Sequence, residues 1–462
     1  MDAGLGRKRA LLAALVVLST AVLTVGYVDA VRQSDRITGD PVVEQAFVTG
    51  DRSPVVAPRE NVTVVATDSN AFVADEGDGP RARSELVAFA PDGSIYYYED
   101  QYTRYWDVDP VAGTTATVEF VYSEHLEGSD CDGSGACTRN GVDRVNLTTG
   151  ERETIYERIT PGKHSSRWHD VDRIDEERLL VADIDRDRVY IVNTVTDVIE
   201  WEWDAQAEYS IQGGGPWPDD WTHSNDVEYV EIDGQEAVMV SLRNQDQVAF
   251  VGLEKGLLED WTLGADGELD TLYEQHNPDF IPAERGGPAV LIGDSENGRI
   301  VEYQWTGEGW EQSWEYADAR ITWPRDADRL PNGHTLVTDS NGDRVFELDE
   351  QSEIVWSADI GFPYESERLG TDDESSGGES AASLDLPSRS AGDDPEDVGL
   401  YRSVVPTDIQ NLVSYAFPRW VGPLQLGAIV VLILSVSTWT AVEYRHRNVS
   451  VRLRWPVRFE RR

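Results

Sequence analysis

The sequence is poor in cysteine and in lysine. Two cysteines in 462 residues exclude a disulfide-dense scaffold and a metal site built from cysteine. Lysine occurs only at Lys8, Lys163 and Lys255, so almost every basic side chain is an arginine. Basic residues are also few overall, because 39 Lys and Arg stand against 86 Asp and Glu, a formal charge of −47. The chain therefore lacks the basic surface with which proteins neutralise nucleic-acid phosphates.

The hydrophobic content is not low, and its value of 40% excludes a fully disordered chain. An acidic, lysine-poor surface suits very high salt, where the Debye length falls to ~3 Å and self-repulsion is screened. We infer an extreme halophile. The alternative is an ordinary acidic protein in which lysine is rare by chance.

Two long apolar segments lie near the ends of the chain. Residues 10–28 follow a basic segment, 1–9, and residues 421–442 precede a basic tail, 443–462. Each segment is long enough to cross a hydrocarbon layer of ~30 Å. Since basic flanks stay inside, both termini are expected in the cytoplasm and the intervening residues outside the cell. The alternative for residues 10–28 is a cleaved signal peptide, which leaves the same residues outside.

The expected extracellular part has two further features. Cys131 and Cys137 could form a disulfide there and close a short loop. Residues 363–412 are rich in Ser, Gly, Asp and Glu. This composition is typical of a solvated chain and predicts an extended acidic linker before the second apolar segment.

A repeat runs through the region between the apolar segments. Its unit has an apolar residue, then Arg or Gln seven positions later, then a β-branched residue. The clear copies begin at Val181, Val240, Ile292 and Val337, and earlier ones pair Tyr97 with Arg104 and Cys137 with Arg144. The units recur about every 40 to 60 residues and contain short apolar runs separated by Asp, Asn and Gly. These features are typical of propeller blades.

We therefore predict an all-β fold, a six-bladed β-propeller over residues 55–362 flanked by one N-terminal and one C-terminal transmembrane helix. The short strand Val64–Thr67 is expected to close the ring by pairing with the last blade. The alternative, a pair of β-sandwiches, does not explain six matches in one frame.

Polar residues recur where each blade begins. The clearly aligned residues are His169, Asn225, His276 and Arg325, and His223 lies two positions before Asn225. The same count in the first two units gives Glu85 and His125, and the match at His125 is weaker. The first strand of every blade lines the central channel, so equivalent residues converge at one rim. The column predicts a site where imidazoles, an amide and a guanidinium meet, which suits an oxyanion.

Other residues beside this column invite two interpretations each. Trp168, Trp217 and Trp221 could wall an aryl group, or they could pack at blade edges. Neighbouring aspartates are expected to accept hydrogen bonds from backbone N–H groups. Alternatively, they could accept hydrogen bonds from the imidazoles and so orient them. These aspartates are Asp170, Asp172, Asp226, Asp279, Asp326 and Asp328.

Short motifs at the blade starts resemble the PAPS-independent arylsulfotransferase family. They are His169-Asp-Val-Asp, His223-Ser-Asn-Asp, His276-Asn-Pro-Asp and Trp323-Pro-Arg-Asp-Ala-Asp-Arg-Leu-Pro-Asn-Gly-His-Thr-Leu-Val-Thr-Asp-Ser340. The chain is similar to a haloarchaeal-type, membrane-anchored member of that family over residues 60–360. The resemblance implies a six-bladed propeller that moves a sulfuryl group from a phenolic sulfate to a phenol through a channel histidine.

The resemblance also implies roles for individual residues. His276, His223 and His169 would serve as nucleophile or sulfate clamp, with the nucleophile unassigned among them. Arg325, which stands where the family pattern has a histidine, would clamp the sulfate oxygens. From the column and its neighbouring aromatics, independently of the resemblance, we expect substrate-binding roles for Asn225, His125, Trp168, Trp217 and Trp221. No cofactor is expected, in line with the absence of a Gly-x-x-x-x-Gly-Lys-Ser/Thr loop; the expected partners are an aryl sulfate, a phenol and the membrane.

Two other functions fit the same column. A membrane-tethered propeller without chemistry would bind an anion, a glycan or a partner protein. Alternatively, three converging imidazoles could hold Zn²⁺. We assign no metal ligands from the sequence.

Overall fold

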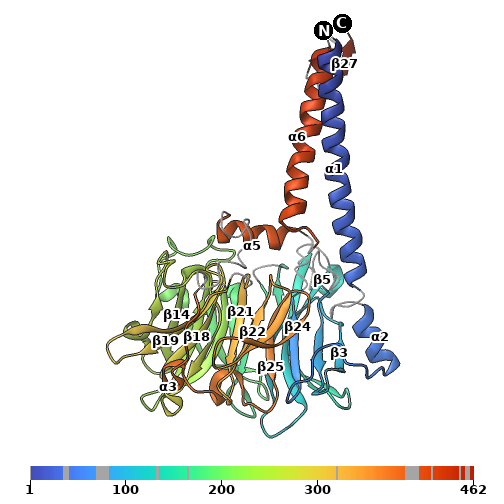
Figure 1. Ribbon diagram of the computed structural model, residues 1–462. Coiled ribbons are helices and arrows are strands. Elements are labelled where there is room, and N and C mark those ends of the chain that lie inside the picture. Colours follow the sequence, from blue (N-terminus) through green and yellow to red (C-terminus); the bar gives the residue numbers. More distant parts are fainter. Residues whose placement is uncertain are drawn as a thin grey trace. The chain divides into compact units, whose positions relative to one another are not determined.

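The computed structural model describes residues 2–34, 41–68, 83–131, 135–163, 166–318, 321–390, 405–417, 420–446, 449–452 and 458–461. The chain forms two compact units, one of Arg36–Ala416 and one of Met1–Asp35 with Phe417–Arg462. In Figure 1 the first unit consists mainly of strands and the second mainly of two long helices.

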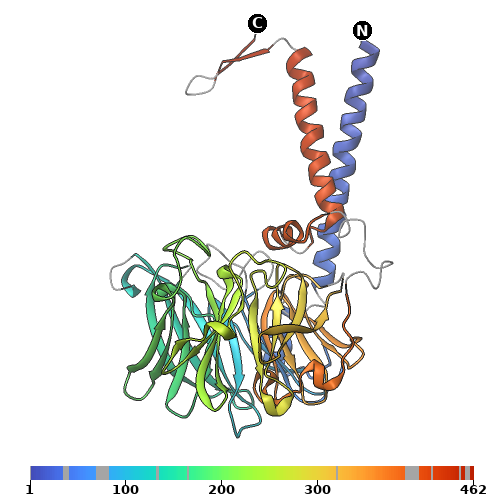
Figure 2. The same cartoon turned by 90° about the vertical axis from the view of Figure 1, so that its left-hand side faces the viewer.

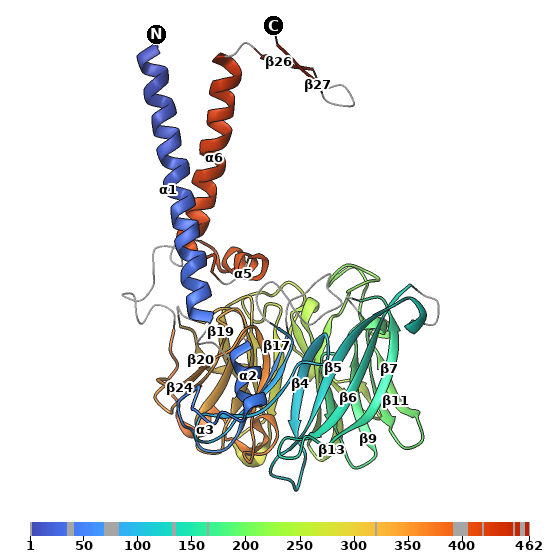
Figure 3. The same ribbon diagram turned by 90° about the vertical axis from the view of Figure 1, so that its right-hand side faces the viewer.

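The larger unit is a six-bladed β-propeller, which confirms the predicted fold. Blade 1 contains β25 (Pro363–Arg368), β1 (Thr63–Thr67), β2 (Leu86–Phe89) and β3 (Ile95–Glu99). Blade 2 contains β4 (Arg104–Pro110), β5 (Thr117–Glu127), β6 (Ala136–Asn146) and β7 (Arg152–Pro161). Figure 3 shows the four strands of blade 2 side by side.

The other four blades follow in chain order. Blade 3 contains β8 (Val171–Arg173), β9 (Arg178–Asp183), β10 (Arg188–Asn193) and β11 (Val198–Asp204). Blade 4 contains β12 (Ser224–Ile232), β13 (Gln235–Leu242), β14 (Gln247–Gly252), β15 (Gly256–Leu257) and β16 (Leu263–Gly264). Blade 5 contains β17 (His276–Ile281), β18 (Ala289–Asp294), β19 (Arg299–Trp305) and β20 (Trp310–Tyr316). Blade 6 contains β21 (Pro324–Arg329), β22 (Thr335–Asp339), β23 (Arg344–Leu348) and β24 (Ile354–Asp359).

The ring closes in blade 1 through a strand beyond the predicted boundary at residue 362. β25 pairs antiparallel with β1, from Thr63 opposite Arg368 to Thr67 opposite Pro363. Val64–Thr67 therefore closes the ring as predicted, but its partner β25 belongs to blade 1, so the prediction that it pairs with the last blade was wrong. One blade thus combines strands from both ends of the propeller sequence, so the ring opens only if the β25–β1 ladder breaks.

The first two segments of the predicted repeat were also placed in the wrong phase. Tyr97 lies on the last strand of blade 1 and Arg104 begins blade 2, while Cys137 and Arg144 lie on one strand. Blade 1 is split between the chain ends, and β5 and β6 are 11 residues each, so the common spacing fails there. A disulfide joins Cys131 to Cys137 beside this long hairpin; residues 132–134 lie outside the described residues.

Residues 363–390 do not form the predicted extended linker. After β25 come a 3₁₀ turn, η7 (Glu374–Gly377), and a short helix, α3 (Ala381–Leu384). The Ala381 N–H donates to both carboxylate oxygens of Glu302, at 2.8 and 3.0 Å. The polar composition suggested a solvated chain, but polar groups of this segment form hydrogen bonds with buried groups of the propeller. Within the rest of the predicted linker, residues 391–404 lie outside the described residues, and α5 (Thr407–Ala416) is helical.

The core lies between neighbouring blades. Apolar side chains from both faces of each sheet pack against the next sheet, as Val189 of blade 3 and Val238 of blade 4 do in one buried cluster. Equivalent clusters join the other neighbouring blades around the ring. Each buried Val, Leu or Ile stabilises the fold by about 1.5–3 kcal/mol, so this packing holds the blade starts in a fixed ring.

The smaller unit contains α1 (Asp2–Ser34), α6 (Pro423–His446) and a hairpin of β26 (Val449–Arg452) and β27 (Arg458–Arg461). The segments Gly4–Val28 and Pro423–His446 are long and apolar enough to cross a membrane. Figure 2 shows α1 and α6 side by side, and Arg9 Nε donates to Glu443 Oε1 at 2.5 Å. The sidedness of these helices stays a prediction. A further helix, α2 (Pro41–Thr49), belongs to the larger unit.

Candidate functional site

The first strands of the blades contact one another around the ring, and their starts surround a pocket of about 300 Å³. Two positions per blade recur there. The first position holds Arg104, Arg167, His223, Glu274, Trp323 and Phe362. The second, two residues later, holds Trp106, His169, Asn225, His276, Arg325 and Tyr364. Both positions lie at or near the start of the first strand of a blade, so they approach the same rim.

A repeated backbone turn accompanies this arrangement. The first position adopts a left-handed conformation in four blades, with φ of 47°, 45°, 61° and 48° at His223, Glu274, Trp323 and Phe362. A non-glycine residue in that region costs on the order of 1–2 kcal/mol, so the surrounding fold must hold it. The turn recurs from blade to blade. It brings His223 to the pocket although this residue lies two positions before the predicted column.

Four of the sequence-predicted catalytic residues come together. His169, His223, His276 and Arg325 all line the pocket, and the rings of His169 and His223 lie 4.9 Å apart. These residues derive from blades 3, 4, 5 and 6, and His169 and Arg325 are 156 positions apart (325 − 169). The remaining predicted residues are placed elsewhere.

Five predicted substrate-binding residues are not part of the pocket lining. Asn225 is buried and donates through Nδ2 to the Gln275 carbonyl at 2.9 Å, which links blades 4 and 5. His125 lies on the second strand of blade 2, where its N–H donates to Thr103 Oγ1. His125 and Glu85 were predicted by counting back along the first two repeat units, whose alignment with the blades was wrong. Trp168 and Trp221 pack in the interblade core, and Trp217 is 41% exposed.

Sequence reasoning missed three arginines, Arg104, Arg167 and Arg243, which also line the pocket. His223 lies two positions before the predicted column, and the same displacement in other blades would have identified Arg167 and Arg104. Moving two positions back from His169 gives Arg167, and correct phasing of blade 2 gives Arg104. Arg243 instead follows β13, and the equivalent loop after the second strand delivers Asp68, Glu296 and Asn341 in other blades.

His276 is held by groups that fix its tautomer. Its Nδ1 lies 3.1 Å from the carbonyl oxygen of Glu274, which can only accept, so Nδ1 carries a proton. The same atom lies 2.8 Å from Ser295 Oγ, and that hydroxyl donates to the Pro324 carbonyl. In the neutral ring, Nε2 therefore keeps a lone pair.

The other two imidazoles differ in their partners. His223 Nδ1 lies 2.7 Å from Asp220 Oδ1, which again places the proton on Nδ1 and the lone pair on Nε2. Neither ring nitrogen of His169 has a hydrogen-bond partner among the described residues, although its side chain is buried against Trp106 with ring centroids 4.1 Å apart. The imidazole of His169 thus lies in the pocket wall with both nitrogens unsatisfied within the described residues.

All three imidazoles are kept neutral. Burial, with the positive charge of Arg325 and Arg243, holds the pKa of His276 well below its ordinary value. Burial and the nearby His223 do the same to His169. Burial and Arg243 lower the pKa of His223 against the opposing charge of Asp220. His223 in turn lowers the pKa of Asp220 to about 2 despite its burial.

The arginines are positioned by aromatic rings and acids. The guanidinium of Arg325 lies 4.4 Å from the centre of the Tyr364 ring and 4.7 Å from that of Trp323. Asp68 contacts Arg104 Nε at 2.9 Å and Arg325 Nη1 at 3.7 Å. Four arginines line the pocket against two lining carboxylates, Asp68 and Glu296, and Glu274 pairs with Arg243 from outside the lining. The lining itself therefore carries more positive than negative groups in a protein of charge −47.

Aromatic side chains supply the apolar walls. Trp106 and Trp323 take the place predicted for the other tryptophans, and Tyr273 and Tyr415 join them. Tyr415 belongs to α5, which Figure 2 shows across one end of the ring. Asn411 of the same helix donates to Glu296 Oε2 at 2.9 Å, so α5 is fastened over the pocket.

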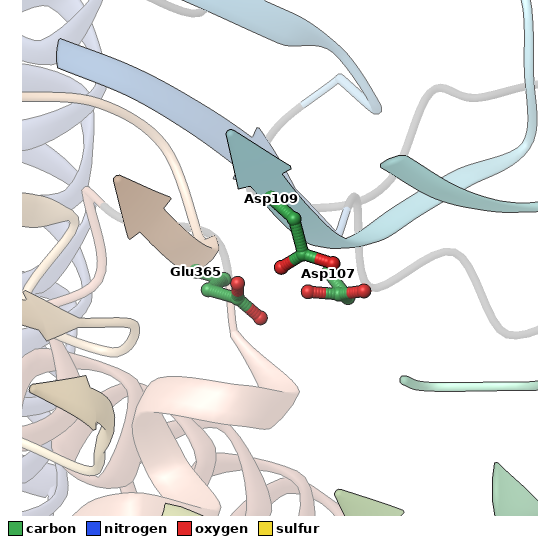
Figure 4. Close-up of side chains that lie close together, drawn as sticks. All are labelled: Asp107, Asp109 and Glu365. Carbon is green, nitrogen blue, oxygen red and sulfur yellow. The ribbon is translucent and has the colours of Figure 1, made fainter. Parts of the chain in front are cut away.

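Below the pocket, carboxylates line the channel in two tiers. Three of the six predicted aspartates, Asp170, Asp172 and Asp326, accept backbone N–H groups of the next blade, as Asp326 does from Ser366 at 3.1 Å and Asp172 from Tyr229 at 2.6 Å. This matches the structural role expected for them. Figure 4 shows one group, in which Asp107 and Asp109 of β4 turn toward Glu365 of β25.

The zinc alternative finds no support in the pocket. Within the described residues, two clusters of three side chains bring their possible metal-ligating atoms within 4.8 Å of one another. Both clusters consist of carboxylates, and neither includes a pocket histidine. Four guanidinium groups and the side chains of Trp106 and Trp323 line the pocket, and such groups interact with oxyanions and with aromatic rings.

Comparisons with known proteins give the fold alone. No family model and no curated protein matches the chain. Similar solved structures include a protein of unknown function from Bacteroides caccae (11% identity, TM-score 0.43, 66% of this chain and 97% of that chain). Others are a putative 6-phosphogluconolactonase from Bacteroides fragilis (12%, 0.39, 66% and 97%) and a periplasmic gluconolactonase from Pseudomonas aeruginosa (15%, 0.40, 67% and 99%).

Proposed function

We propose that the protein is an arylsulfotransferase-like enzyme that moves a sulfuryl group from a phenolic sulfate ester to a phenolic acceptor. The observation that carries this proposal is the tautomer of His276. A neutral imidazole with its lone pair on Nε2, facing a pocket of four arginines, is a nucleophile beside an oxyanion site. The motif resemblance described above points to the same chemistry.

In the first half-reaction, His276 Nε2 attacks the sulfur of the aryl sulfate. The N–S bond forms as the bond between sulfur and the phenolic oxygen breaks, and the phenolate leaves with that electron pair. Arg325, with Arg104 and Arg243, neutralises the sulfuryl oxygens while charge shifts toward the leaving group. Trp106 and Trp323 hold the aryl ring.

In the second half-reaction, an acceptor phenol replaces the first product. His223 Nε2 takes the phenolic proton, and Asp220 stabilises the imidazolium that results. The phenolic oxygen then attacks the sulfur, and the bond to His276 breaks. His223 passes its proton to the released phenolate or to solvent, so each cycle exchanges one sulfuryl group for one proton.

We propose further that the propeller works outside the cell in concentrated salt, held by one or both apolar helices. The flanking arginines and the disulfide support this placement. The acidic, lysine-poor composition supports the salt requirement.

The test is transfer from 4-nitrophenyl sulfate to a second phenol by the full-length chain in detergent and molar salt. Release of nitrophenolate that depends on the acceptor is expected. His276→Ala is expected to abolish it, whereas His334→Ala, a histidine outside the pocket, is expected to leave it unchanged. Binding of aryl sulfate without turnover would replace the proposal by the non-catalytic alternative.

A further inference from the structure

We propose that the channel of the propeller binds a divalent cation of the Ca²⁺ type between Asp279, Asp326 and Asp328. This site is separate from the sulfuryl-transfer chemistry and does not depend on it. The three carboxylates come from the first strands of blades 5 and 6, and each offers an oxygen within 4.8 Å of the others.

The site is buried and surrounded by like charge. Asp279, Asp326 and Asp328 are 2%, 3% and 2% exposed. The charges that act most strongly on Asp328 and Asp279 are other carboxylates, among them Asp326, Glu367 and Asp373, while Arg368 and Arg329 interact with Asp328 and Asp279 more weakly. Three clustered carboxylates that form no salt bridge within the described residues need either protons or a cation.

Carboxylate oxygens that lack a partner point to a ligand independently of the cluster. Oδ2 of Asp328 is buried and makes no hydrogen bond within the described part of the chain. The same holds for Oδ2 of Asp226 and Oε2 of Glu367, which flank the trio and act on Asp279 and Asp328 respectively. Leaving such atoms unpaired in a protein interior is unfavourable, so a bound cation is the simplest way to satisfy them.

The chemistry of the ligands favours Ca²⁺. All the available atoms are oxygens, which hard cations prefer, and the flanking acids allow more than three ligands. Ca²⁺ accepts six to eight oxygens in irregular geometry, whereas Mg²⁺ demands near-octahedral geometry and keeps its water. Hydrogen bonds already reach members of both carboxylate groups, since Asp326 accepts from Ser366 and Glu365 of the Figure 4 group accepts from Val108. The Figure 4 group is the weaker candidate because, among the described residues, Asp328 has a buried carboxylate oxygen without a partner and no residue of the Figure 4 group does.

The experiment measures calcium on the full-length chain in detergent and molar KCl. After treatment with chelator and dialysis, Ca²⁺ is added, free ion is removed, and bound metal is measured by mass spectrometry. About one retained Ca²⁺ per chain is expected, with a rise in Tm of about 5 °C at a hundredfold excess over Kd. Mg²⁺ at the same concentration should give a clearly smaller rise.

Variants locate the ion. Asp328→Asn, which keeps the size of the side chain, should lose both the retained Ca²⁺ and the calcium-dependent rise in Tm. The matched control is Asp294→Asn, a buried carboxylate already paired with Arg299 at 2.7 Å, which should keep both. If Asp328→Asn does not fold, Asp226→Asn serves, with weaker calcium retention expected.

Three results would overturn the inference. The first is no retained metal and no Tm shift in the unmodified chain at Ca²⁺ up to about 10 mM, above the range of weak extracellular calcium sites. The second is unchanged retention in both channel variants. The third is an equal response to Mg²⁺.

Discussion

The Nδ1 atom of His276 donates to the backbone carbonyl of Glu274 across 3.1 Å. Because a carbonyl never donates, this contact sets the tautomer of the ring without a charged partner. The equivalent nitrogen of His223 faces the carboxylate of Asp220 instead. The two imidazoles therefore suit different tasks, one as a nucleophile and the other as a base whose protonated form is stabilised.

This difference predicts distinct effects of replacing His223. His223→Gln should lower transfer to an ordinary phenol by about 10²–10⁴-fold, since the acceptor loses its general base. The loss should shrink for more acidic phenols, which need less help to give up their proton. Steady-state rates across a series of acceptors of different pKa measure this; an equal loss for all acceptors would contradict the assigned role.

Arg325 is predicted to act mainly on the transition state. Arg325→Met should lower kcat by about 10²–10³-fold, because the guanidinium neutralises sulfuryl oxygens as charge redistributes. Arg325→Lys should recover little, since a point charge cannot copy the planar fork that rests on Tyr364 and Trp323. Arg158→Met, at an exposed ion pair with Asp197, is the control and should keep full activity.

The pH dependence follows from the neutral imidazoles. Burial and Arg325 hold the pKa of His276 well below 6.5, so Nε2 stays unprotonated as the pH falls through that value. The acid limb of kcat/KM should therefore lie below pH 6.5. Arg243→Gln removes a cationic neighbour and should move the limb to higher pH. A limb at or above pH 6.5 in the unmodified enzyme, or one that stays in place in this variant, would refute the account.

Glu302 is predicted to fasten the segment after the last blade to the propeller. It is buried, accepts from Arg329 at 3.1 Å and holds the N–H of Ala381. Glu302→Ala leaves the Arg329 charge buried and should lower the free energy of unfolding by about 3–5 kcal/mol. Glu202→Ala, at an exposed ion pair with Arg188, should change it by less than about 1 kcal/mol. Denaturant unfolding in molar salt compares them, and equal losses would count against this role.

The sequence was sufficient to predict the propeller and the core of the pocket because repetition carries geometry. Six similar units imply a ring, and a ring brings His169, His276 and Arg325 together although they are far apart in the chain. His223 was found beside its column only because its neighbours matched the pattern.

The failures have identifiable physical causes. The closing strand β25 was missed because Glu365 and Glu367 are charged, yet both side chains are buried in the channel. His125 and Glu85 were wrongly placed in the polar column because blade 1 is split between the chain ends and the hairpin of blade 2 is long, which changes the spacing of the first two units. Trp168 and Trp221 were assigned to the pocket by proximity in sequence to His169 and His223, but both precede the first strand of their blades and pack in the interblade core.

The most direct measurement is capture of the covalent enzyme intermediate. The full-length chain is incubated in molar salt with 4-nitrophenyl sulfate and no acceptor, quenched under alkaline conditions, digested and examined by mass spectrometry. One sulfuryl group on the peptide that contains His276 is expected, and a phenol added before the quench should discharge it. A peptide that stays unmodified while the enzyme turns over, or modification at His169 or His223 instead, would contradict the account.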